Sequence, residues 1–550
     1  MMSFDQTPIN QLITDNIDTW TSTVKTKATT GRGSSKKLEL YGVKKLRELI
    51  LELAVRGKLV PQDPSDEPAS VLLERIAAEK AQLVKDKRIK KPKKLSEIKE
   101  EDELFTLPKG WAWARLGTVG NVFNGNSIST RLKSEKYSDG VGLPYLSTKD
   151  IGYGFDKLSY TVDTHVPENE PKFKLAPKNT VLICAEGGSA GKKCGLVDRD
   201  IFFGNKLFAN VPYSGIKSSF LLSLYLTPLF FEQFSEKMTG IIGGISVSNF
   251  VELLVPVPPQ EEQHRIVAKV DELMTLCDQL EQQTEASIEA HQVLVTTLLD
   301  TLTNSASAEE LMHNWQMVAE HFDTLFTTEE SIDQLKQTIL QLAVMGKLVN
   351  IGEKKETLLK SVLTFGPRNG FSPKESSTET QLKVLKLGAT SYGVLDLKQS
   401  KFIDVDISDK PYLYINQGDI LIQRGNSANF VGSNVLIQES YSDYIYPDLM
   451  MKLRVNDEVL PEYVSLLLSS KFSREHMWSQ MTGTSGTMPK ISKKVVEGVP
   501  IMFPVCLAVQ KTILEKYNEL IGVCELLMAR LNFLEYTKVN LTDAIVEQAV

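Results

Sequence analysis

The sequence predicts a mixed α/β (α+β) protein in which two globular α/β domains are separated by a pair of long, antiparallel coiled-coil helices. Two stretches, near the middle and at the end of the chain, carry apolar residues at alternating spacings of four and three, the period of a coiled coil. Short β-type runs separated by turn residues precede each stretch. The order helix, α/β domain, long helix occurs twice. The expected fold is therefore an internal repeat with pseudo-twofold symmetry and one domain at each end of the helix pair.

Length and composition are those of a large soluble protein. The 550 residues are too many for one ordinary core and suggest three or four units. Hydrophobic residues make up 42% of the chain and charged residues 24%, a typical balance for a globular protein. No apolar run approaches the roughly 20 residues that a membrane span needs, and the first residues do not resemble a secretory signal. We therefore expect a cytoplasmic protein without membrane contact.

Charge and cysteine usage restrict the function only weakly. The net charge of −7 argues mildly against a nucleic-acid binder, but a net charge averages over surfaces that do different things. The cysteines lack the paired spacing of a metal site, so we expect free thiols at Cys184, Cys194, Cys277, Cys506 and Cys524.

Composition shifts and proline stops divide the chain into seven predicted segments. Pro258 and Pro259 end the first α/β domain, because proline offers no N–H and restricts the residue before it. The segments are a flexible N-terminal part (1–37), a helical region with a basic linker (38–104), the first α/β domain (105–258), the central coiled-coil helix (259–304), a helical linker (305–352), the second α/β domain (353–504) and the C-terminal coiled-coil helix (505–550).

The N-terminal region combines helices with a strongly basic run. Residues 1–37 predict a weak helix followed by a flexible Gly- and Ser-containing joint. Leu46–Val60 is an amphipathic helix that ends at Gly57, and residues 69–84 form another helix. In Lys85–Lys99, eight of fifteen residues are basic and Pro92 prevents a continuous helix. This run reads as a solvated linker, and the alternative is a phosphate contact.

Each α/β domain consists of short β-type runs and one longer helical stretch. In the first domain the helical stretch is Ser218–Met238, and in the second it is Pro461–Met481. We expect each of these stretches to form a single helix.

The two coiled-coil helices are predicted from their apolar seams. The first seam comprises Ile266, Val270, Leu273, Cys277 and Leu280, and after polar breaks at Thr284 and Ser287 it resumes at Leu294, Leu298 and Leu302. The second comprises Ile513, Tyr517, Leu520, Cys524, Leu527, Leu531, Leu534, Leu541 and Ile545. At about 1.5 Å per residue the helices are roughly 55 and 50 Å long. The alternative is two unrelated amphipathic helices, each packed on its own domain.

Local identity supports the duplication. Leu46–Val60 recurs as Leu335–Val349 with ten of fifteen positions identical, more than a shared helical pattern explains. Met238-Thr239-Gly240 recurs as Met481-Thr482-Gly483, and a Gln-x-x-Ile tetrapeptide begins each long helix at Gln263 and Gln510.

The usual catalytic signatures are missing. Gly191-Lys192-Lys193 lacks both the upstream glycine and the Ser/Thr of a phosphate-binding loop. The chain has no Asn-Pro-Pro-Tyr tetrapeptide of amino-methyltransferases, no G-x-G-x-x-G after a strand and no Asp…Glu-x-Lys cluster of nucleases. The six histidines are scattered without metal-binding spacing. We therefore expect no catalytic residue and no metal on this chain.

Loops rich in Gly, Asn, Ser and basic residues occur at corresponding places in both domains. Such loops expose N–H groups and side chains that bind phosphates, and Arg and Asn read purine edges. The alternative is ordinary turn chemistry. The candidate contacts are Arg131, Lys133, Lys192, Lys193, Asn205 and Lys206 in the first domain, and Arg368, Asn369, Arg424, Asn426, Asn429, Ser485 and Lys490 in the second.

Together these motifs resemble the specificity subunits of type I restriction-modification enzymes. The resemblance rests on LPKGWAWARLG at Leu107, on VPVPPQEEQHRI at Val255, on GDILIQRGN at Gly418 and on the duplicated A-V-x-G-K-L-V helix, and it covers most of residues 40–550. The second domain lacks a Leu-Pro-x-Gly-Trp opening, and its exit lacks the acidic Glu-Glu-Gln.

The resemblance implies a non-catalytic subunit of a restriction endonuclease and adenine DNA methyltransferase complex. Each α/β domain would be a target-recognition domain for half of a bipartite, asymmetric site in double-stranded DNA, and the long helices would set the gap between the halves. Two methylation subunits and the restriction subunits would join this chain. S-adenosylmethionine, ATP and Mg would bind to those partners, and this chain would need no cofactor.

The repeated helices are candidates for docking the two methylation subunits, since two like subunits require two like surfaces. The predicted contacts are Leu49, Leu53, Val55, Leu59, Ile339, Leu342, Val344 and Leu348. Internal packing against the long helices is the alternative. For the whole chain, a symmetric scaffold whose loops bind protein rather than DNA is the second functional hypothesis, and an enzyme with an unrecognised site is the third.

Overall fold

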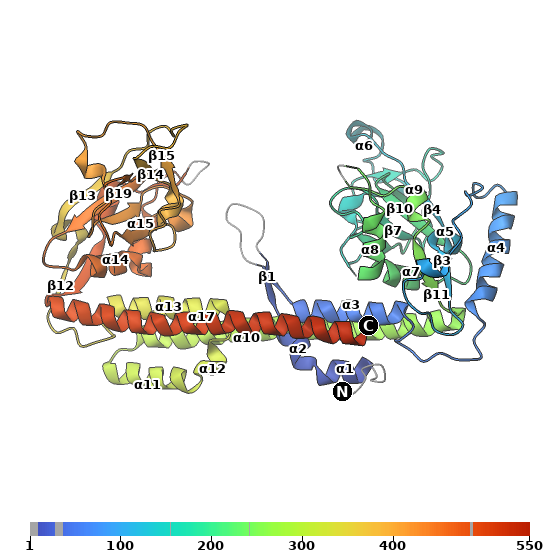
Figure 1. Cartoon of the computed structure of the whole chain (residues 1–550), viewed down its shortest axis with the longest axis horizontal. Coiled ribbons are helices and arrows are strands. Elements are labelled where there is room, and N and C mark those ends of the chain that lie inside the picture. Colours follow the sequence, from blue (N-terminus) through green and yellow to red (C-terminus); the bar gives the residue numbers. More distant parts are fainter. Residues whose placement is uncertain (1–8, 28–36, 155, 241–242, 484–487) are drawn as a thin grey trace. The chain divides into compact units, whose positions relative to one another are not determined.

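The computed structural model describes residues 9–27, 37–154, 156–240, 243–483 and 488–550 (Figure 1). Of the joint predicted at Gly31–Lys37, residues 31–36 lie outside the described residues. The chain forms two compact units. Unit 1 contains Lys36–Glu285 and Glu535–Val550 together with the N-terminal residues, and unit 2 contains Ala286–Leu534. Among the described helices, none is long and apolar enough to cross a lipid bilayer.

Unit 1 begins with short helices and a two-stranded ribbon, followed by the first α/β domain. Its helices are α1 Ile9–Asp15, α2 Ile17–Ser22, α3 Tyr41–Val55, α4 Ala69–Lys85, α5 Leu116–Val119, α6 Thr130–Lys136, α7 Ser218–Tyr225, α8 Pro228–Glu236 and α9 Val247–Phe250. Its strands are β1 Lys25–Lys27, β2 Lys37–Glu39, β3 Ala112–Arg115, β4 Gly120–Asn124, β5 Leu143–Leu146, β6 His165–Val166, β7 Val181–Cys184, β8 Cys194–Leu196, β9 Phe202–Phe203, β10 Leu207–Pro212 and β11 Leu254–Val257.

Unit 2 contains the second α/β domain. Its helices are α11 Ala308–Glu320, α12 Phe322–Leu325, α13 Glu329–Val344, α14 Pro461–Ser469, α15 Lys471–Ser479 and α16 Lys493–Glu497. Its strands are β12 Lys354–Leu358, β13 Leu363–Asn369, β14 Lys383–Leu385, β15 Ser400–Phe402, β16 Ile420–Gln423, β17 Asn434–Leu436, β18 Tyr444–Ile445, β19 Met450–Val455 and β20 Pro500–Pro504. Two long helices, α10 Gln260–Asn304 and α17 Leu507–Ala549, contribute residues to both units.

The two α/β domains have the same sheet topology. Each contains an antiparallel four-stranded sheet, in the order β4-β10-β7-β8 in unit 1 and β13-β19-β16-β17 in unit 2. Each also contains a three-stranded sheet with one antiparallel and one parallel pair, and a two-stranded sheet that joins the first strand of the domain to the last. The internal repeat predicted from short identical segments therefore extends through both domains.

The prediction of one helix per domain is wrong in both units. Ser218–Met238 forms α7 and α8, separated at Thr227, whose hydroxyl accepts a hydrogen bond from the N–H of Phe230 while Pro228 occupies the first position of α8. Pro461–Met481 forms α14 and α15, separated at Ser470, whose hydroxyl accepts from the N–H of Ser473. In each case a hydroxyl N-cap starts a second helix at the same place.

The long helices pair, but their buried seams shift by one residue. In α10 the first five predicted seam residues are buried, whereas Leu294 is 50% exposed and Val295 and Leu299 lie in the core. In α17 Leu541 is likewise 50% exposed and the next residue, Thr542, is buried. A helix with 3.6 residues per turn drifts by about 20° per heptad relative to a strict seam, so an extra residue restores the buried face.

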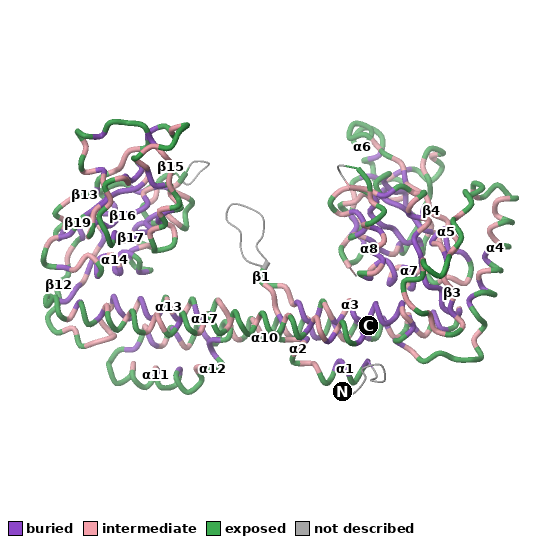
Figure 2. Tube along the Cα trace, viewed as in Figure 1, coloured by how far each residue is buried: buried purple, intermediate pink, exposed green. Residues whose placement is uncertain are grey.

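A third helix joins the long helices in each unit (Figure 2). In unit 1, α3 shares a core with the first half of α10 and with Ile545 and Ala549 at the end of α17. In unit 2, α13 shares a core with the second half of α10 and with Cys524 of α17. The first part of each long helix thus meets the last part of the other, as in an antiparallel pair. The alternative of two unrelated helices is therefore excluded.

Candidate nucleic-acid interface

A buried glutamine fixes each α/β domain to the start of its long helix. In unit 1, Gln263 Nε2 donates to the carbonyl of Pro258, and Gln263 Oε1 accepts from the N–H of Lys217, the N-cap of α7. In unit 2, Gln510 Nε2 donates to Pro504 O, and Gln510 Oε1 accepts from the N-cap residue of α14. Both glutamines are fully buried. The recurring Gln-x-x-Ile tetrapeptide therefore has a positional role.

In unit 1, the tryptophan of the Leu-Pro-x-Gly-Trp motif contacts an acidic residue at the start of α10. Trp111 Nε1 donates to Glu262 Oε2 over 3.0 Å, and burial raises the pKa of Glu262. A Cβ on Gly57 would lie 2.5 Å from Pro108, because the end of α3 packs on the same motif. In unit 2, a Cβ on the equivalent Gly346 would lie 2.7 Å from Ile351. An isoleucine thus occupies the place of the missing Leu-Pro-x-Gly-Trp motif.

In each domain, one of the loops predicted to contact DNA follows the same strand of the four-stranded sheet. The loop after β7 ends at Gly191 and the loop after β16 ends at Gly432, with φ values of +70° and +81°. Each glycine N–H donates to the last carbonyl of the preceding strand, that of Cys184 or Gln423. A Cβ would lie 2.7 Å from Phe234 in unit 1 and 2.8 Å from Met477 in unit 2, so glycine is required at both turns.

A second loop pairs with each of these loops. In unit 1, Gly244 forms β-bridges with Glu186 and with Thr239 of the repeated Met-Thr-Gly segment. In unit 2, Lys490 forms bridges with Gly425 and with Thr482 of the corresponding segment. In unit 2 both loops carry predicted contacts, whereas in unit 1 the second loop was not among the predicted contact loops.

The unit 1 candidates are mostly exposed but occupy two different regions. Arg131 and Lys133 lie on α6, where Arg131 Nε donates to Glu135 and Lys133 Nζ lies 5.0 Å from the ring centroid of Tyr145. Lys193 lies in the loop after β7 with its Nζ 4.7 Å from the ring of Tyr153.

The remaining unit 1 candidates lie close to that loop. Lys192 is exposed, with its Nζ 5.8 Å from the ring of Phe231. Asn205 and Lys206 form the exposed turn between β9 and β10, and the carbonyl of Lys206 accepts from the N–H of Ala185. This turn therefore lies beside the loop after β7.

The unit 2 candidates in the loop after β16 are held by specific hydrogen bonds. Arg424 is half-buried and its Nε donates to the carbonyl of Ile491, while Asn426 Nδ2 donates to Gln423 Oε1 over 2.7 Å. Asn429 and Lys490 are exposed. Asn429 and Lys490 thus remain accessible to a ligand, whereas Asn426 is fixed by its neighbour.

The last candidates lie on β13 or outside the described residues. The guanidinium of Arg368 lies 3.4 Å from the ring centroid of Tyr412. Asn369 follows on the same strand, and its Oδ1 is buried without a hydrogen-bond partner among the described residues. Ser485 lies outside the described residues.

Two polar groups of unit 2 were not identified from the sequence, and one of them holds the loop after β16. Arg474 on α15 donates to Ser433 Oγ and to the carbonyl of Asn429, and burial lowers the pKa of Arg474 to about 10. At the opposite end of β16, Asp419 pairs with Lys452 at 3.1 Å and Arg454 at 2.6 Å. These residues are far apart in sequence, so only the sheet register brings them together.

The apolar residues predicted to dock methylation subunits lie inside the protein. Seven of the eight, all except the half-buried Leu348, are at most 8% exposed. They pack against the long helices and the α/β domains, because the apolar face of an amphipathic helix is the face that needs a core. These apolar residues therefore pack inside the protein, as the alternative interpretation of the repeated helices expected.

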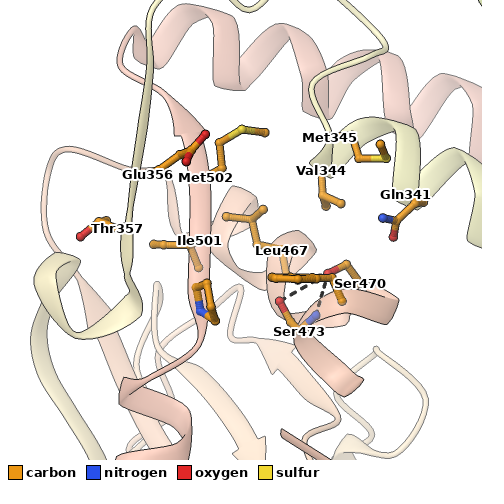
Figure 3. Close-up of a pocket in the computed structure, with 12 residues that line it drawn as sticks. Gln341, Val344, Met345, Glu356, Thr357, Leu467, Ser470, Ser473, Ile501 and Met502 are labelled. Atoms are coloured by element: carbon orange, nitrogen blue, oxygen red, sulfur yellow. Dashed lines mark hydrogen bonds between the residues drawn. The ribbon is translucent and has the colours of Figure 1, made fainter. Parts of the chain in front are cut away.

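Beside α13, unit 2 contains an open apolar pocket of about 340 Å³ (Figure 3). Gln341 of α13 and Met345, which follows the helix, line one side, and Ile501 and Met502 of β20 line the other. Gln341 Oε1 is buried and has no partner among the described residues. In unit 1 the equivalent Glu52 accepts from the N–H of Leu229 and pairs with Arg56.

The corresponding place in unit 1 is covered by aromatic side chains. The rings of Phe105 and Trp113 meet edge-to-face at 4.9 Å, and the guanidinium of Arg56 lies 4.9 Å from Phe105. Sheet register places Glu356 of unit 2 at the position of Trp113.

The described residues offer binding groups rather than reactive ones. No group of three or more His, Cys, Asp or Glu residues that could hold a metal ion occurs among them. The loops present lysine, arginine and asparagine donors, which suit phosphate oxygens and base edges. All five cysteines are free thiols, as expected from the sequence.

Comparison with known proteins identifies the family. Residues 108–290 match the family model described as the type I restriction modification DNA specificity domain. The chain is 35% identical to the type I restriction enzyme EcoEI specificity subunit of Escherichia coli, over 98% of this chain and 100% of the relative. It is 36% identical to the EcoAI specificity subunit of Escherichia coli, also over 98% and 100%.

A solved structure supports the fold independently. A chain from a structure on complex assembly and conformational transition of the type I R-M system aligns with a TM-score of 0.53 and 18% identity, over 81% of this chain and 98% of that chain. Fold, coverage and identity agree. The chain therefore belongs to the specificity subunits of type I restriction enzymes, the non-catalytic subunits that recognise the DNA target and work with methylation and restriction subunits.

Proposed function

We propose that the two α/β domains each read one half of a bipartite, asymmetric DNA target. The observation that carries this proposal is the repeat itself, because two domains with the same sheet order present their paired loops after equivalent strands, β7 and β16. The loops differ in sequence and length, so the two half-sites differ. Residues of the two paired loops in each domain recognise the bases through hydrogen bonds to base edges, while lysines contact phosphates.

The paired helices α10 and α17 set the unread gap. They have 45 and 43 residues, so each is about 65 Å long at roughly 1.5 Å per residue. That length exceeds one turn of duplex, about 34 Å, and allows several untouched base pairs between the half-sites. An uninterrupted helix transmits a fixed length, which a flexible linker does not.

Two methylation subunits dock on equivalent surfaces of α3 and α13. Since Leu53 and Leu342 are buried with their neighbours, the contact uses the outward-facing residues of both helices. S-adenosylmethionine, ATP and Mg bind to the partner subunits. The assembly acts on cellular DNA, so the chain works in the cytoplasm.

The base-reading residues are drawn from the paired loops. Arg424 at the start of the unit 2 loop is our first candidate for a bidentate contact to a guanine, with Asn429 and Lys490 beside it. Replacing Arg424 by Ala should lower affinity by about 1–3 kcal/mol and relax one position of one half-site. A variant that methylates the same target with unchanged preference would remove Arg424 from the interface.

Methylome sequencing of the host with and without the gene tests the proposed function. Two short sequence elements separated by a constant gap should lose methylation when the gene is deleted. Purified chain with its methylation subunit should also bind duplex DNA with an affinity that falls steeply with salt. A methylome that does not change, together with salt-independent binding to protein alone, would support the scaffold hypothesis instead.

A further inference from the structure

The segment between α4 and β3 forms a basic wall at one edge of the unit 1 sheet. Six of the eight residues in Lys87–Lys94 are Lys or Arg. Residues of this segment and of the edge strand β4 line one hollow of about 580 Å³. The hollow is separate from the paired loops after β7.

The basic wall is fixed at both ends. On the α4 side, the N–H groups of Arg88 and Ile89 donate to the carbonyl of Leu83, and Ile89 packs on the unit 1 core. On the β3 side, the N–H of Ser96 donates to the Glu252 carboxylate. The segment is therefore tethered at both ends, which lowers the entropic cost of binding.

A second anchor holds the β3 side. Arg115 donates to the carbonyls of Ser96 and Glu97 and pairs with Glu252 at 3.6 Å. Glu252 lines the hollow, but its carboxylate already binds the N–H of Ser96 and the guanidinium of Arg115. The acidic group nearest to the wall is thus already engaged.

Few carboxylates of the protein neutralise the positive charge of the wall lysines. Among the described residues, the ion pair recorded for Lys90–Lys94 joins Lys94 to Glu97 at 3.9 Å, with both side chains almost fully exposed. Such a pair contributes little. The wall therefore presents several positive charges without a matching set of carboxylates.

Two further lysines, Lys80 of α4 and Lys174, also line the hollow. Lys80 Nζ donates to the carbonyl of Gly117 over 2.7 Å, and Lys174 Nζ donates to Asn124 O over 2.8 Å. Burial lowers the pKa of both amines, and the charge of Lys90 lowers the pKa of Lys174 further. A group of like charges held this close gains from a polyanion that lies between them.

Unit 2 has no equivalent of the basic wall among its described residues. The connection from α13 to β12 covers residues 345–353 and contains one basic residue, Lys347. Lys347 Nζ donates to the carbonyls of Thr303 and Ser305 inside the unit. A ligand of the basic wall therefore engages unit 1 and finds no equivalent segment among the described residues of unit 2.

We infer that Lys87–Lys94, backed by Lys80 and Lys174, is a sequence-independent phosphate-binding site for duplex DNA that flanks the half-site of unit 1. This inference rests on the proposed function, since it extends DNA binding beyond the base-reading loops. Lys90 to Lys94 spans at most about 14 Å of extended chain, or about four base pairs at roughly 3.4 Å each. The specificity subunit thus contacts flanking DNA on one side of its target.

The test removes four charges from the wall of the full chain in complex with its methylation subunit. In one variant Lys90, Lys91, Lys93 and Lys94 are replaced by Gln. Its matched control carries four Lys→Gln changes in unit 2, at Lys354, Lys355, Lys511 and Lys516, which form exposed ion pairs with Glu356, Glu458, Glu515 and Glu519. The probes are labelled duplexes carrying the mapped target, with or without about 20 flanking base pairs.

The wall variant should bind the flanked duplex about 10-fold more weakly, and its slope of log affinity against log salt should fall by about 2–3. The control should match the wild type, and a Lys→Arg version of the wall should restore affinity. The methylated sequence should stay the same. Equal salt slopes for the wall variant and the control, or a changed half-site, would overturn the inference, as would failure of the variant to bind its methylation subunit. If the wild-type complex itself binds no duplex, the proposed function fails instead.

Discussion

The two four-stranded sheets share their strand order but differ in the chemistry of their interiors. Sheet register aligns Thr180, Cys184, Cys194 and Ala209 of unit 1 with Asp419, Gln423, Asn434 and Lys452 of unit 2, and all eight residues are buried. Unit 1 uses small or weakly polar groups where unit 2 uses a charged and amide network. The same backbone therefore supports two different interiors.

This difference extends to the loops. Gln423 Nε2 donates to Leu387 O and Thr390 Oγ1, while Gln423 Oε1 accepts from Asn426. In unit 1 the equivalent loop packs on phenylalanines, with Gly191 against Phe234. A polar network fixes donors in defined directions, whereas apolar packing fixes mainly position. Two domains of common origin can thus present unlike loops to unlike half-sites.

The largest expected effect of this difference follows from breaking the charged network. In an Asp419→Ala variant, Lys452 would remain buried without its partner, and the opening free energy of unit 2 should fall by about 3–5 kcal/mol. Hydrogen exchange of amides in β16 and β19 measures this loss within the full chain. Thr180→Val in unit 1, which removes one hydrogen bond to Pro177, should cost about 1 kcal/mol. Equal losses in the two units would contradict the comparison.

The sequence predicts the repeat and the helices better than the interiors. Local periodicity predicts the long helices α10 and α17. Repeated segments, such as the Gln-x-x-Ile tetrapeptides at Gln263 and Gln510, predict the duplicated helix and the corresponding loop positions. The pairing of Asp419 with Lys452 and of Arg474 with Asn429 depends on sheet register and helix packing, which local patterns do not encode. The break between α7 and α8 could have been predicted, because Thr227-Pro228 is an N-cap followed by proline.

The shared feature of the two units should give matched effects. Gln263→Ala and Gln510→Ala each remove a buried side chain that satisfies a carbonyl and an N-cap N–H, so each should cost about 1–3 kcal/mol. The loss should appear as faster exchange at the start of α7 or α14, in the mutated unit only. A cost confined to one of the two variants would show that the glutamines have diverged in role.

The smallest effect concerns the thiols. Burial raises the pKa of Cys184 to about 11 and that of Cys194 to about 12, so at pH 8 their thiolate fraction is at most about one in a thousand. Burial also raises the pKa values of Cys277 and Cys524. A thiol reagent should therefore modify the exposed Cys506 first in the native chain, and all five cysteines in denaturant. Rapid labelling of Cys184 would contradict the tight unit 1 interior.

The role of the paired helices as a spacer is tested most directly by changing their length. Insertion of about four residues in both α10 and α17 keeps the helix nearly in phase and adds about 6 Å, which is close to two base pairs. Methylation mapping should then show both half-sites unchanged and a gap longer by about two base pairs. Altered half-sites with an unchanged gap would contradict the account.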